Sequence, residues 1–262
     1  MLRSLHRAAR NPNRGGTPLP LPFKAFAHYG LAIRKGELTM IAAKAGSGKS
    51  VMAISMAMAM KVPTLYFSID SGELTQQIRC LQAITGLDSR QVEEKIQEDP
   101  DTAAALIKQH AGHIKWDFDS ESMWDVEEEF KVYRELMGEA PSLVILDNAS
   151  DINYENGDMY QSLKQLMKEL KRWARAENVA FVALHHVNGM DPNHPWKPCP
   201  PMDALQGKIS EKPAVILTIG KAQDGFMPVA PVKNRGGVAD DTGKTAMWLR
   251  YDPSTMTLKD TV

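Results

Sequence analysis

The sequence predicts an α/β fold, with helices on both faces of a mostly parallel central sheet. Three observations support this prediction: short apolar runs alternate with helical stretches, one run leads directly into a glycine-rich turn and a helix, and two runs end in an aspartate. Continuous apolar runs are typical of strands buried on both faces, and open parallel sheets bind ligands at the carboxyl ends of their strands. We therefore expect the functional residues to gather at that edge of the sheet.

The composition bears on the domain organisation and the compartment. With 262 residues, of which 43% are hydrophobic, the chain can bury one substantial core, and we expect one domain over residues 23–262. Cys80 and Cys199 form neither a disulfide framework nor a metal-binding spacing, which favours a reducing cytoplasm. No apolar run approaches the roughly 20 residues of a membrane span, so no membrane partner is expected. The formal net charge of −1 means that nucleic-acid binding must come from local basic patches or from assembly.

Residues 1–22 are expected to form a basic arm and a proline-rich linker. Prolines recur through residues 17–22, which makes the linker stiff and extended. The basic side chains of the arm, with no acid among residues 1–16, are Arg3, His6, Arg7, Arg10 and Arg14. The arm is either a clasp on a neighbouring subunit or a phosphate backbone, or a solvated tail, and the sequence leaves both interpretations open.

The most specific motif lies between the predicted strand Leu38–Ala42 and the helical run Val51–Met60. Its residues, Ala-Lys-Ala-Gly-Ser-Gly-Lys-Ser at 43–50, fit the phosphate-loop pattern with alanine in place of the first glycine. The glycines let backbone N–H groups surround a polyphosphate at a helix N-terminus, whose dipole favours negative charge. Lys49 is expected to reach the β- and γ-phosphates of ATP, and the Ser50 hydroxyl to bind Mg²⁺. The alternative, a turn that binds nothing, explains the flanking strand and helix less well. The predicted nucleotide-binding residues are Ala45, Gly46, Ser47, Gly48, Lys49, Ser50 and Val51.

Two further apolar runs end in a carboxylate. Thr64–Ile69 is a predicted strand that ends at Asp70, and Leu143–Leu146 is another that is closed by Asp147. Asp70 is a candidate general base, and its alternative role is a cap or turn ahead of the predicted helix at 73–84. Asp147 follows the phosphate loop by about one hundred residues, where such folds place the aspartate that holds the water shell of Mg²⁺. A capping role is the alternative for Asp147 as well.

The remaining segments are assigned from periodicity and turn residues. Phe23–Ile33 is expected to pack beneath the sheet, and the methionines of the first long helix to fill the core. Residues 72–111 are predicted to form two or three short helices, N-capped by Asp88 and Asp101. The other predicted elements are a strand at 114–118, helices at 122–137 and 159–176, strands at 179–184 and 214–220, a hairpin of 227–232 with 246–251 around a charged turn, and an edge strand at 255–258.

The predicted strand at 179–184 is followed by His185 and His186. Two histidines without a nearby cysteine or carboxylate pattern are a weak zinc signal, so we interpret them as a polar tip near the phosphate site. The long loop at 187–210 is rich in proline and carries Lys197 and Lys208. Long loops within compact domains are usually functional or mobile.

Five blocks of the chain, taken in order, resemble the RecA-like ATPase domain of DnaB-type replicative helicases over nearly all of residues 20–262. They are Ala-Lys-Ala-Gly-Ser-Gly-Lys-Ser at 43–50, Tyr66-Phe-Ser-Ile-Asp70, Leu143-Val-Ile-Leu-Asp147, Val182-Ala-Leu-His-His186, and Val232-Lys-Asn-Arg235 through Gly243. The resemblance implies a RecA-like P-loop NTPase core with a C-terminal antiparallel hairpin.

The resemblance also implies roles for individual residues. Asp70 takes the place of the catalytic carboxylate, and His186 the place of the γ-phosphate sensor. Lys233 and Arg235 take the place of residues that reach a neighbouring subunit's nucleotide. The loops after Asp147 and His186 correspond to the single-strand-binding loops that line the channel of a ring.

Three features depart from the family pattern. The usual catalytic carboxylate is glutamate, which is one methylene longer than Asp70. We expect the short basic arm to stand in place of the separate N-terminal domain of cellular helicases, as in the compact single-domain helicases of phages and plasmids. The first predicted DNA loop carries Asp151, Glu155 and Asp158 and neither lysine nor arginine. Its negative charges repel a phosphate backbone, which is bound mainly through lysine and arginine.

The resemblance implies an Mg²⁺-dependent ATPase that moves along single-stranded DNA as a homo-oligomeric, hexameric ring and unwinds duplex DNA in phage or plasmid replication. Expected partners are single-stranded DNA and helicase-loading or replisome proteins in the host cytoplasm. Two other functions fit the same core: a recombination or strand-annealing ATPase, and a regulatory ATPase that does not bind DNA. Unwinding of a forked duplex, strand pairing without unwinding, and ATPase activity indifferent to DNA distinguish the three, because fold analogy alone does not.

Overall fold

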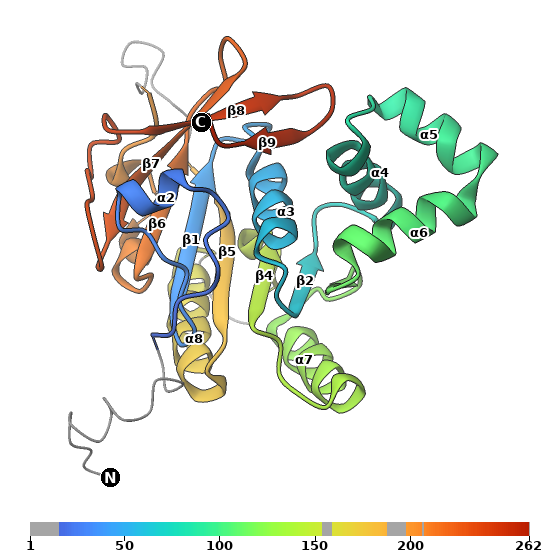
Figure 1. The fold of residues 1–262 in the computed structure, drawn as a ribbon. Coiled ribbons are helices and arrows are strands. Elements are labelled where there is room, and N and C mark those ends of the chain that lie inside the picture. Colours follow the sequence, from blue (N-terminus) through green and yellow to red (C-terminus); the bar gives the residue numbers. More distant parts are fainter. Residues whose placement is uncertain (1–15, 154–158, 188–197, 206, 262) are drawn as a thin grey trace.

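Nine strands form one sheet, in the order β3-β2-β4-β5-β1-β6-β7-β8-β9, in the computed structural model of the chain (Figure 1). The structure describes residues 16–153, 159–187, 198–205 and 207–261. Residues 1–15 of the predicted arm and linker at 1–22 lie outside the described residues, so the arm stays a prediction. The strands are β1 (Leu38–Ala43), β2 (Thr64–Ser68), β3 (Ile114–Asp117), β4 (Leu143–Asp147), β5 (Ala180–His186), β6 (Val215–Ile219), β7 (Phe226–Asn234), β8 (Met247–Asp252) and β9 (Thr257–Lys259).

The strands from β3 to β6 in that order run parallel, which confirms the predicted parallel sheet. Every residue of β1, β2, β4 and β6 is buried. Such continuous burial requires cover on both faces, and it explains why these strands appear in the sequence as unbroken apolar runs. The carboxyl ends of the parallel strands all lie at one edge of the sheet.

The C-terminal strands are antiparallel, and they confirm the predicted hairpin. β7 pairs with both β6 and β8, and β9 adds to β8 as the last strand of the sheet. The β8–β9 pair lies over the phosphate-loop side of the sheet in Figure 1, and β9 contacts the helix that follows the phosphate loop. The C-terminal strands therefore lie beside the phosphate loop, which is formed by the early part of the chain.

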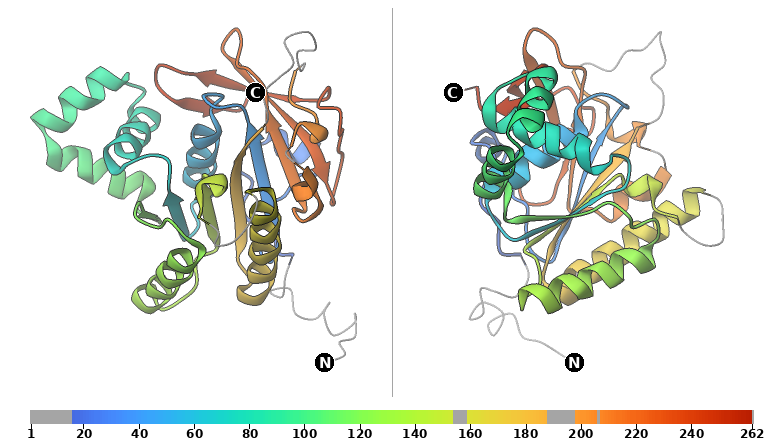
Figure 2. Two further views of the ribbon diagram at one scale, coloured as in Figure 1. Left: turned by 180° about the vertical axis from the view of Figure 1, so that it is seen from behind. Right: turned by 90° about the vertical axis from the view of Figure 1, so that its right-hand side faces the viewer.

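Helices cover both faces of the sheet, as predicted (Figure 2). One core cluster joins α2 and α3 to the sheet through Phe26, Met52 and Met56, and the other joins α7 and α8 to the opposite face through Phe130 and Leu166. The helices are α2 (Ala25–His28), α3 (Lys49–Met60), α4 (Glu73–Thr85), α5 (Ser89–Glu98), α6 (Pro100–Ala111), α7 (Met123–Met137) and α8 (Met159–Glu177), with short 3-10 turns η1 (Ala149–Asp151), η2 (Met202–Ala204) and η3 (Gly207–Glu211).

One of the two predicted helix caps is wrong. Asp88 caps α5 as predicted, in a reciprocal arrangement with Gln91. Asp99, not Asp101, caps α6, because its side chain accepts a hydrogen bond from the Thr102 backbone at 3.0 Å. The reason is Pro100, which occupies the first helical position, where its missing N–H costs nothing, and so moves the start of the helix back by two residues.

Candidate functional site

The phosphate loop connects the end of β1 to the first turn of α3. Gly46 and Gly48 have positive φ angles of 73° and 88°, a conformation that favours glycine. Gly48 is the N-cap of α3 and makes no side-chain capping bond, so the N–H groups of the first turn stay available for an anionic ligand. A Cβ atom at Gly48 would lie 2.5 Å from Met227 Cε of β7, so no larger residue fits without displacing that side chain.

A cavity of about 220 Å³ opens at the N-terminus of α3, and it brings together most of the predicted site. The predicted residues Asp70, Asp147 and His186 all line it together with the phosphate loop. The complete lining is Ala45, Gly46, Gly48, Lys49, Ser50, Val51, Asp70, Arg79, Asp147, Asn148, His186, Tyr251 and Met256.

Strand register explains why these residues meet. In the parallel sheet Ala43, the last residue of β1, pairs with His186 of β5. Likewise Ser68, the last residue of β2, pairs with Asp147 of β4. The carboxyl ends of four different strands therefore converge beside one helix N-terminus, as expected for ligand sites in open α/β sheets.

Lys49 and His186, which both line the cavity, are in direct contact. Lys49 Nζ lies 3.1 Å from His186 Nδ1 and 3.5 Å from the Ala43 carbonyl oxygen. Burial lowers the pKa of Lys49, and the nearby carboxylates Asp147 and Asp70 oppose that shift. Burial and the Lys49 charge also lower the pKa of His186, so the ring is neutral and its Nδ1 accepts a hydrogen bond from the ammonium.

Asn148 fixes the other nitrogen of the His186 ring. Its side-chain amide contacts His186 Nε2, which carries the ring proton when Nδ1 is an acceptor. Asn148 is buried, and its Oδ1 has no hydrogen-bond partner among the described residues. Rotating the side-chain amide by 180° exchanges its nitrogen and oxygen, so that Oδ1 accepts a hydrogen bond from the Nε2 proton of His186. The tautomer and the orientation of His186 are thus set from both sides.

Asp147 is a buried carboxylate whose surroundings fit a divalent cation. It is only 3% exposed, and it accepts a hydrogen bond from the Tyr66 hydroxyl at 2.7 Å. Burial raises the pKa of Asp147, while hydrogen bonds from Tyr66 and Ser50 and the charge of Lys49 lower it. Mg²⁺ prefers hard oxygen ligands and is commonly held by one or two protein groups together with phosphate oxygens of the ligand. The Ser50 hydroxyl and the Asp147 carboxylate are protein groups of this kind.

Asp70 lies exposed at the end of β2, beside the same cavity. The alternative of a helix cap is not what the structure shows, because Gly72 is the N-cap of α4 and no side chain caps that helix. The Asp70 backbone N–H points to the Asp147 carbonyl oxygen at 3.4 Å, which ties the ends of β2 and β4 together. The carboxylate is therefore available to act on a ligand.

Lys233 and Arg235 lie at the opposite edge of the sheet. β7 is antiparallel to β6, so its end at Asn234 pairs with Val215, where β6 begins. Arg235 is exposed, and among the described residues its Nη2 donates to the Glu211 carbonyl oxygen at 3.3 Å. Lys233 donates to the backbone carbonyls of Ser210 and Glu211, and burial together with the charge of Arg235 lowers its pKa to about 8. Neither side chain is near the phosphate loop of its own subunit.

Several lining residues carry no recognisable signal in the sequence. Asn148 is adjacent to a predicted ligand, and Arg79 lies nine positions after Asp70, but Tyr251 and Met256 come from β8 and the turn after it. Their contribution depends on the path of the C-terminal strands, which no local pattern predicts.

Other predictions are not decided by the described residues. Residues 188–197, which include Lys197, and residue 206 of the loop at 187–210 fall outside them, and so does the side chain of Lys208. Within the described part of the chain, no cluster of His, Cys, Asp and Glu is arranged to hold a metal through protein ligands alone. In the same part, no helix is both long and apolar enough to cross a membrane.

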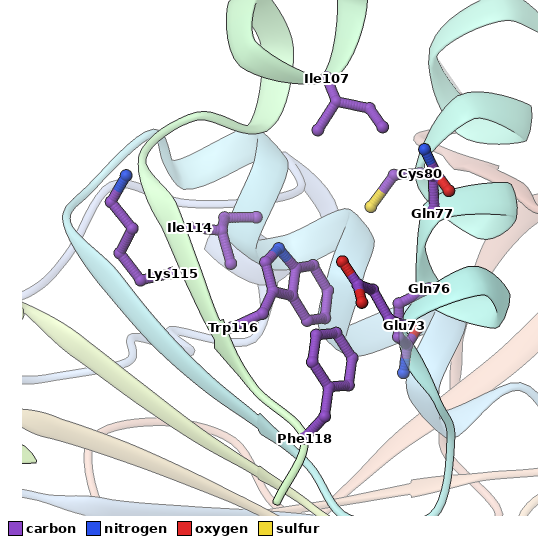
Figure 3. Close-up of a pocket in the computed structure, with 9 residues that line it drawn as sticks. All are labelled: Glu73, Gln76, Gln77, Cys80, Ile107, Ile114, Lys115, Trp116 and Phe118. Atoms are coloured by element: carbon purple, nitrogen blue, oxygen red, sulfur yellow. The ribbon is translucent and has the colours of Figure 1, made fainter. Parts of the chain in front are cut away.

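A second cavity, of about 450 Å³, lies at the β3 edge of the sheet (Figure 3). Trp116 lies in β3, and Phe118 directly follows that strand. Their rings stack in this cavity with centroids 6.0 Å apart, and α4 forms the facing wall. This cavity shares no residue with the phosphate-loop cavity, but Gln76 of α4 lines it.

Fold and site together define the class of the protein: a RecA-like P-loop domain, a fold that implies nucleotide binding. The family model that matches is an AAA domain, over residues 28–189, and the chain belongs to that family. It is 32% identical over 253 residues to the Gene 65 protein of Mycobacterium phage L5, covering 94% of both chains. It is 30% identical over 239 residues to the Gene 65 protein of Mycobacterium phage D29, covering 85% of this chain and 99% of the relative.

Solved structures confirm the predicted fold. One solved ATPase domain has a TM-score of 0.77 at 14% identity, covering 98% of this chain and 96% of the other. A DnaB-like replicative helicase, described together with its interactions with primase, has a TM-score of 0.76 at 14% identity. The match covers 98% of this chain and 65% of the helicase chain. The RadB recombinase has a TM-score of 0.60 at 13% identity, and the match covers 93% of this chain and 100% of the recombinase chain. The fold is that of a DnaB-type RecA-like ATPase domain.

Proposed function

We propose that the chain is an Mg²⁺-dependent ATPase that moves along single-stranded DNA as a homo-oligomeric ring and unwinds duplex DNA in phage replication. The observation that carries the ATPase part is the convergence of Lys49, Asp70, Asp147 and His186 on one cavity at the N-terminus of α3. The helicase part is supported by the fold shared with a DnaB-like replicative helicase and by phage-encoded relatives. These relatives also support action in the cytoplasm of the host cell.

The chemistry is phosphoryl transfer to water. Asp70 orients a water molecule toward the γ-phosphorus and accepts its proton as the new P–O bond forms. The bond from phosphorus to the bridging oxygen breaks, and ADP leaves with that electron pair. Lys49 neutralises charge on the β- and γ-phosphates. Ser50 and Asp147 would hold Mg²⁺, whose chemistry when bound is to neutralise the same two phosphates.

The Lys49–His186 contact supports the proposed role of His186 as a sensor of the γ-phosphate. A bound phosphate competes for the Lys49 ammonium and so removes the hydrogen bond to Nδ1. His186 is anchored through Asn148 to the start of the η1 segment that follows β4. A change at the nucleotide thereby reaches the first candidate DNA loop.

Arg235 is proposed to act on the nucleotide of a neighbouring subunit. It lies exposed at the far edge of the sheet from its own phosphate loop, with a positively charged group that includes Lys171, Lys212 and Lys233 around it. A head-to-tail contact between copies brings this edge to the next subunit's cavity, and repetition of that contact closes a ring. We propose a hexamer, with a helicase loader or other replisome proteins as further partners.

A recombination ATPase is the second candidate, since the chain also shares its fold with the RadB recombinase. The experiment that separates the two uses a forked duplex, a blunt duplex and two complementary single strands, each with ATP. Separation of the forked duplex supports the helicase. Pairing of the complementary strands without separation of the fork supports the recombinase instead.

A further inference from the structure

Tyr66 is a buried polar side chain that the ATPase mechanism above does not use. It lies in the middle of β2, is 0% exposed, and donates a hydrogen bond from its hydroxyl to Asp147 Oδ2 at 2.7 Å. A distance of that size is typical of a hydroxyl that donates to a charged carboxylate. Burial, and then the Asp147 charge, raise the pKa of Tyr66 well above its ordinary value, so the hydroxyl keeps its proton and remains a donor.

The register of β2 and β4 brings these two side chains together. In the parallel sheet Tyr66 pairs with Ile145, and two residues further along both strands Ser68 pairs with Asp147. Because side chains alternate between the two faces of a strand, Tyr66 and Asp147 lie on the same face, one side-chain repeat apart. The hydroxyl at the tip of the long tyrosine side chain covers that diagonal. Phenylalanine at the same position has the ring but not the donor.

The Tyr66 ring is itself held in place. Its register partner in β3 is Trp116, and the centroids of the two rings lie 4.4 Å apart. Trp116 also forms part of the wall of the β3-edge cavity (Figure 3). Aromatic rings in contact attract each other beyond the effect of burial alone. The ring that carries the hydroxyl therefore has little freedom to move away from Asp147.

The end of β2 holds the main chain of Asp147 as well. The Asp147 carbonyl oxygen accepts a hydrogen bond from the Ile69 N–H at 2.7 Å. Ser68, the register partner of Asp147, accepts a hydrogen bond at its Oγ from Gln76 Nε2 at 2.7 Å. Gln76 is only 1% exposed, and its Oε1 accepts a hydrogen bond from Arg79 Nη1 at 3.3 Å. β2 thus fixes both the main chain and the carboxylate of Asp147.

The contact with Tyr66 leaves the rest of the carboxylate available to a cation. An ionised carboxylate offers about four lone-pair positions on its two oxygens. Tyr66 uses a position on Oδ2, which restricts rotation of the carboxylate about its Cβ–Cγ bond. Groups that hydrogen-bond to a metal ligand orient that ligand and change its affinity for the metal. A carboxylate held in this way needs no reorientation when the cation arrives with the nucleotide.

We propose that Tyr66 is a positioning residue for the cation: it holds the Asp147 carboxylate in the orientation that binds Mg²⁺ or its water shell beside the nucleotide phosphates. This inference rests on the proposed ATPase function. Tyr66 is not among the residues that line the phosphate-loop cavity, so it acts on the cation through Asp147. Its loss therefore weakens metal binding and leaves the affinity for metal-free nucleotide as it is.

The test measures two affinities: that of Mn²⁺, a paramagnetic substitute for Mg²⁺, for the ADP-bound protein, and that of ADP in the presence of EDTA. Tyr66→Phe is expected to weaken Mn²⁺ binding about ten- to hundredfold, the usual effect of losing a partner of a metal ligand. The ADP affinity in EDTA is expected to stay unchanged. Tyr133→Phe is the matched control, since Tyr133 is a buried tyrosine of α7 in the core cluster on the opposite face of the sheet.

A double variant shows whether the effect passes through the carboxylate. In an Asp147→Asn protein, adding Tyr66→Phe is expected to cause no further loss of Mn²⁺ affinity, because both changes act on one ligand. A further loss of the same size contradicts the inference. So does unchanged Mn²⁺ affinity in Tyr66→Phe, or an equal loss of ADP affinity with and without metal, which indicates a role in packing only.

If Tyr66→Phe does not fold, Trp116→Leu decides. It keeps the hydroxyl but removes the ring that holds Tyr66, so Mn²⁺ binding is expected to weaken at constant ADP affinity in EDTA, and unchanged Mn²⁺ binding overturns the inference. The wild type separates this inference from the proposed function. Wild-type protein that binds no ADP, or binds it equally well with and without Mn²⁺, refutes the Mg²⁺-dependent ATPase and this inference with it.

Discussion

The stability of the protein is expected to fall as the pH drops from 7 to 4, because of His185. This residue lies in β5 beside the sensor His186, is 1% exposed, and neither ring nitrogen has a hydrogen-bond partner among the described residues. Burial, with smaller contributions from His186 and Lys49, lowers its pKa from 6.5 to about 4. The folded protein therefore keeps the ring neutral where the unfolded chain binds a proton.

The magnitude follows from proton linkage. The unfolded state binds more protons than the folded state between pH 6.5 and about 4, so the free energy of unfolding rises with pH in that window. Integrating the two titrations gives a loss of about 2 kcal/mol at pH 5 and about 3 kcal/mol at pH 4, relative to pH 7. A loss of that size is a large fraction of a typical folding free energy.

The assay is urea unfolding of the wild type and of His185→Leu at pH 7 and pH 5. Leucine removes the titrating ring, so the wild type is expected to lose about 2 kcal/mol more than the variant over this interval. His110→Gln is the control, since His110 is exposed on α6 and is expected to leave the pH dependence unchanged. Equal losses in the wild type and His185→Leu would refute the reasoning.

Three further predictions concern the proposed function. Lys49→Ala is expected to abolish ATP turnover because the charge opposite the β- and γ-phosphates is removed, and unchanged hydrolysis would contradict the site assignment. Asp70→Asn is expected to lower turnover far more than ATP affinity, since a carboxylate that orients water acts mainly in the transition state. Equal single-turnover rates in the wild type and the Asp70→Asn protein would contradict the catalytic role of Asp70. Replacing Lys197 and Lys208 together by alanine is expected to weaken binding of single-stranded DNA and reduce the salt slope by about 0.7 for each phosphate that is no longer neutralised. Titrations at several salt concentrations measure this, and an unaltered slope would point to the arginines of the basic arm.

The sequence predicted the parts of the fold that depend on local pattern. Leu143–Leu146 and the other buried runs are recognisable because a strand covered on both faces must be apolar throughout. Asp70, Asp147 and His186 could be assigned to one site because parallel strands end at a common edge. Asp101 was assigned wrongly as a cap because the effect of Pro100 on the helix start outweighs the general preference for aspartate there.

The rest of the cavity could not be predicted because it depends on packing between distant segments. Tyr66 is an apolar strand residue in the sequence, and only the pairing of β2 with β4 brings its hydroxyl to Asp147. Tyr251 and Met256 line the cavity because the sheet continues through the antiparallel strands and returns over α3. Arg79 is one of several polar residues on α4 until the network through Gln76 is seen.

The central claim is that ATP is hydrolysed between neighbouring subunits, and a mixing experiment tests it most directly. Arg235→Ala and Lys49→Ala proteins are each expected to be nearly inactive, since an arginine supplied in trans contributes about three to five powers of ten in other phosphoryl-transfer systems. Mixed in equal amounts, they are expected to regain part of the wild-type turnover, because some interfaces then pair an intact Lys49 with an intact Arg235. If Arg235→Ala alone assembles normally and hydrolyses ATP at the wild-type rate, the trans-acting role and the ring motor built on it are contradicted.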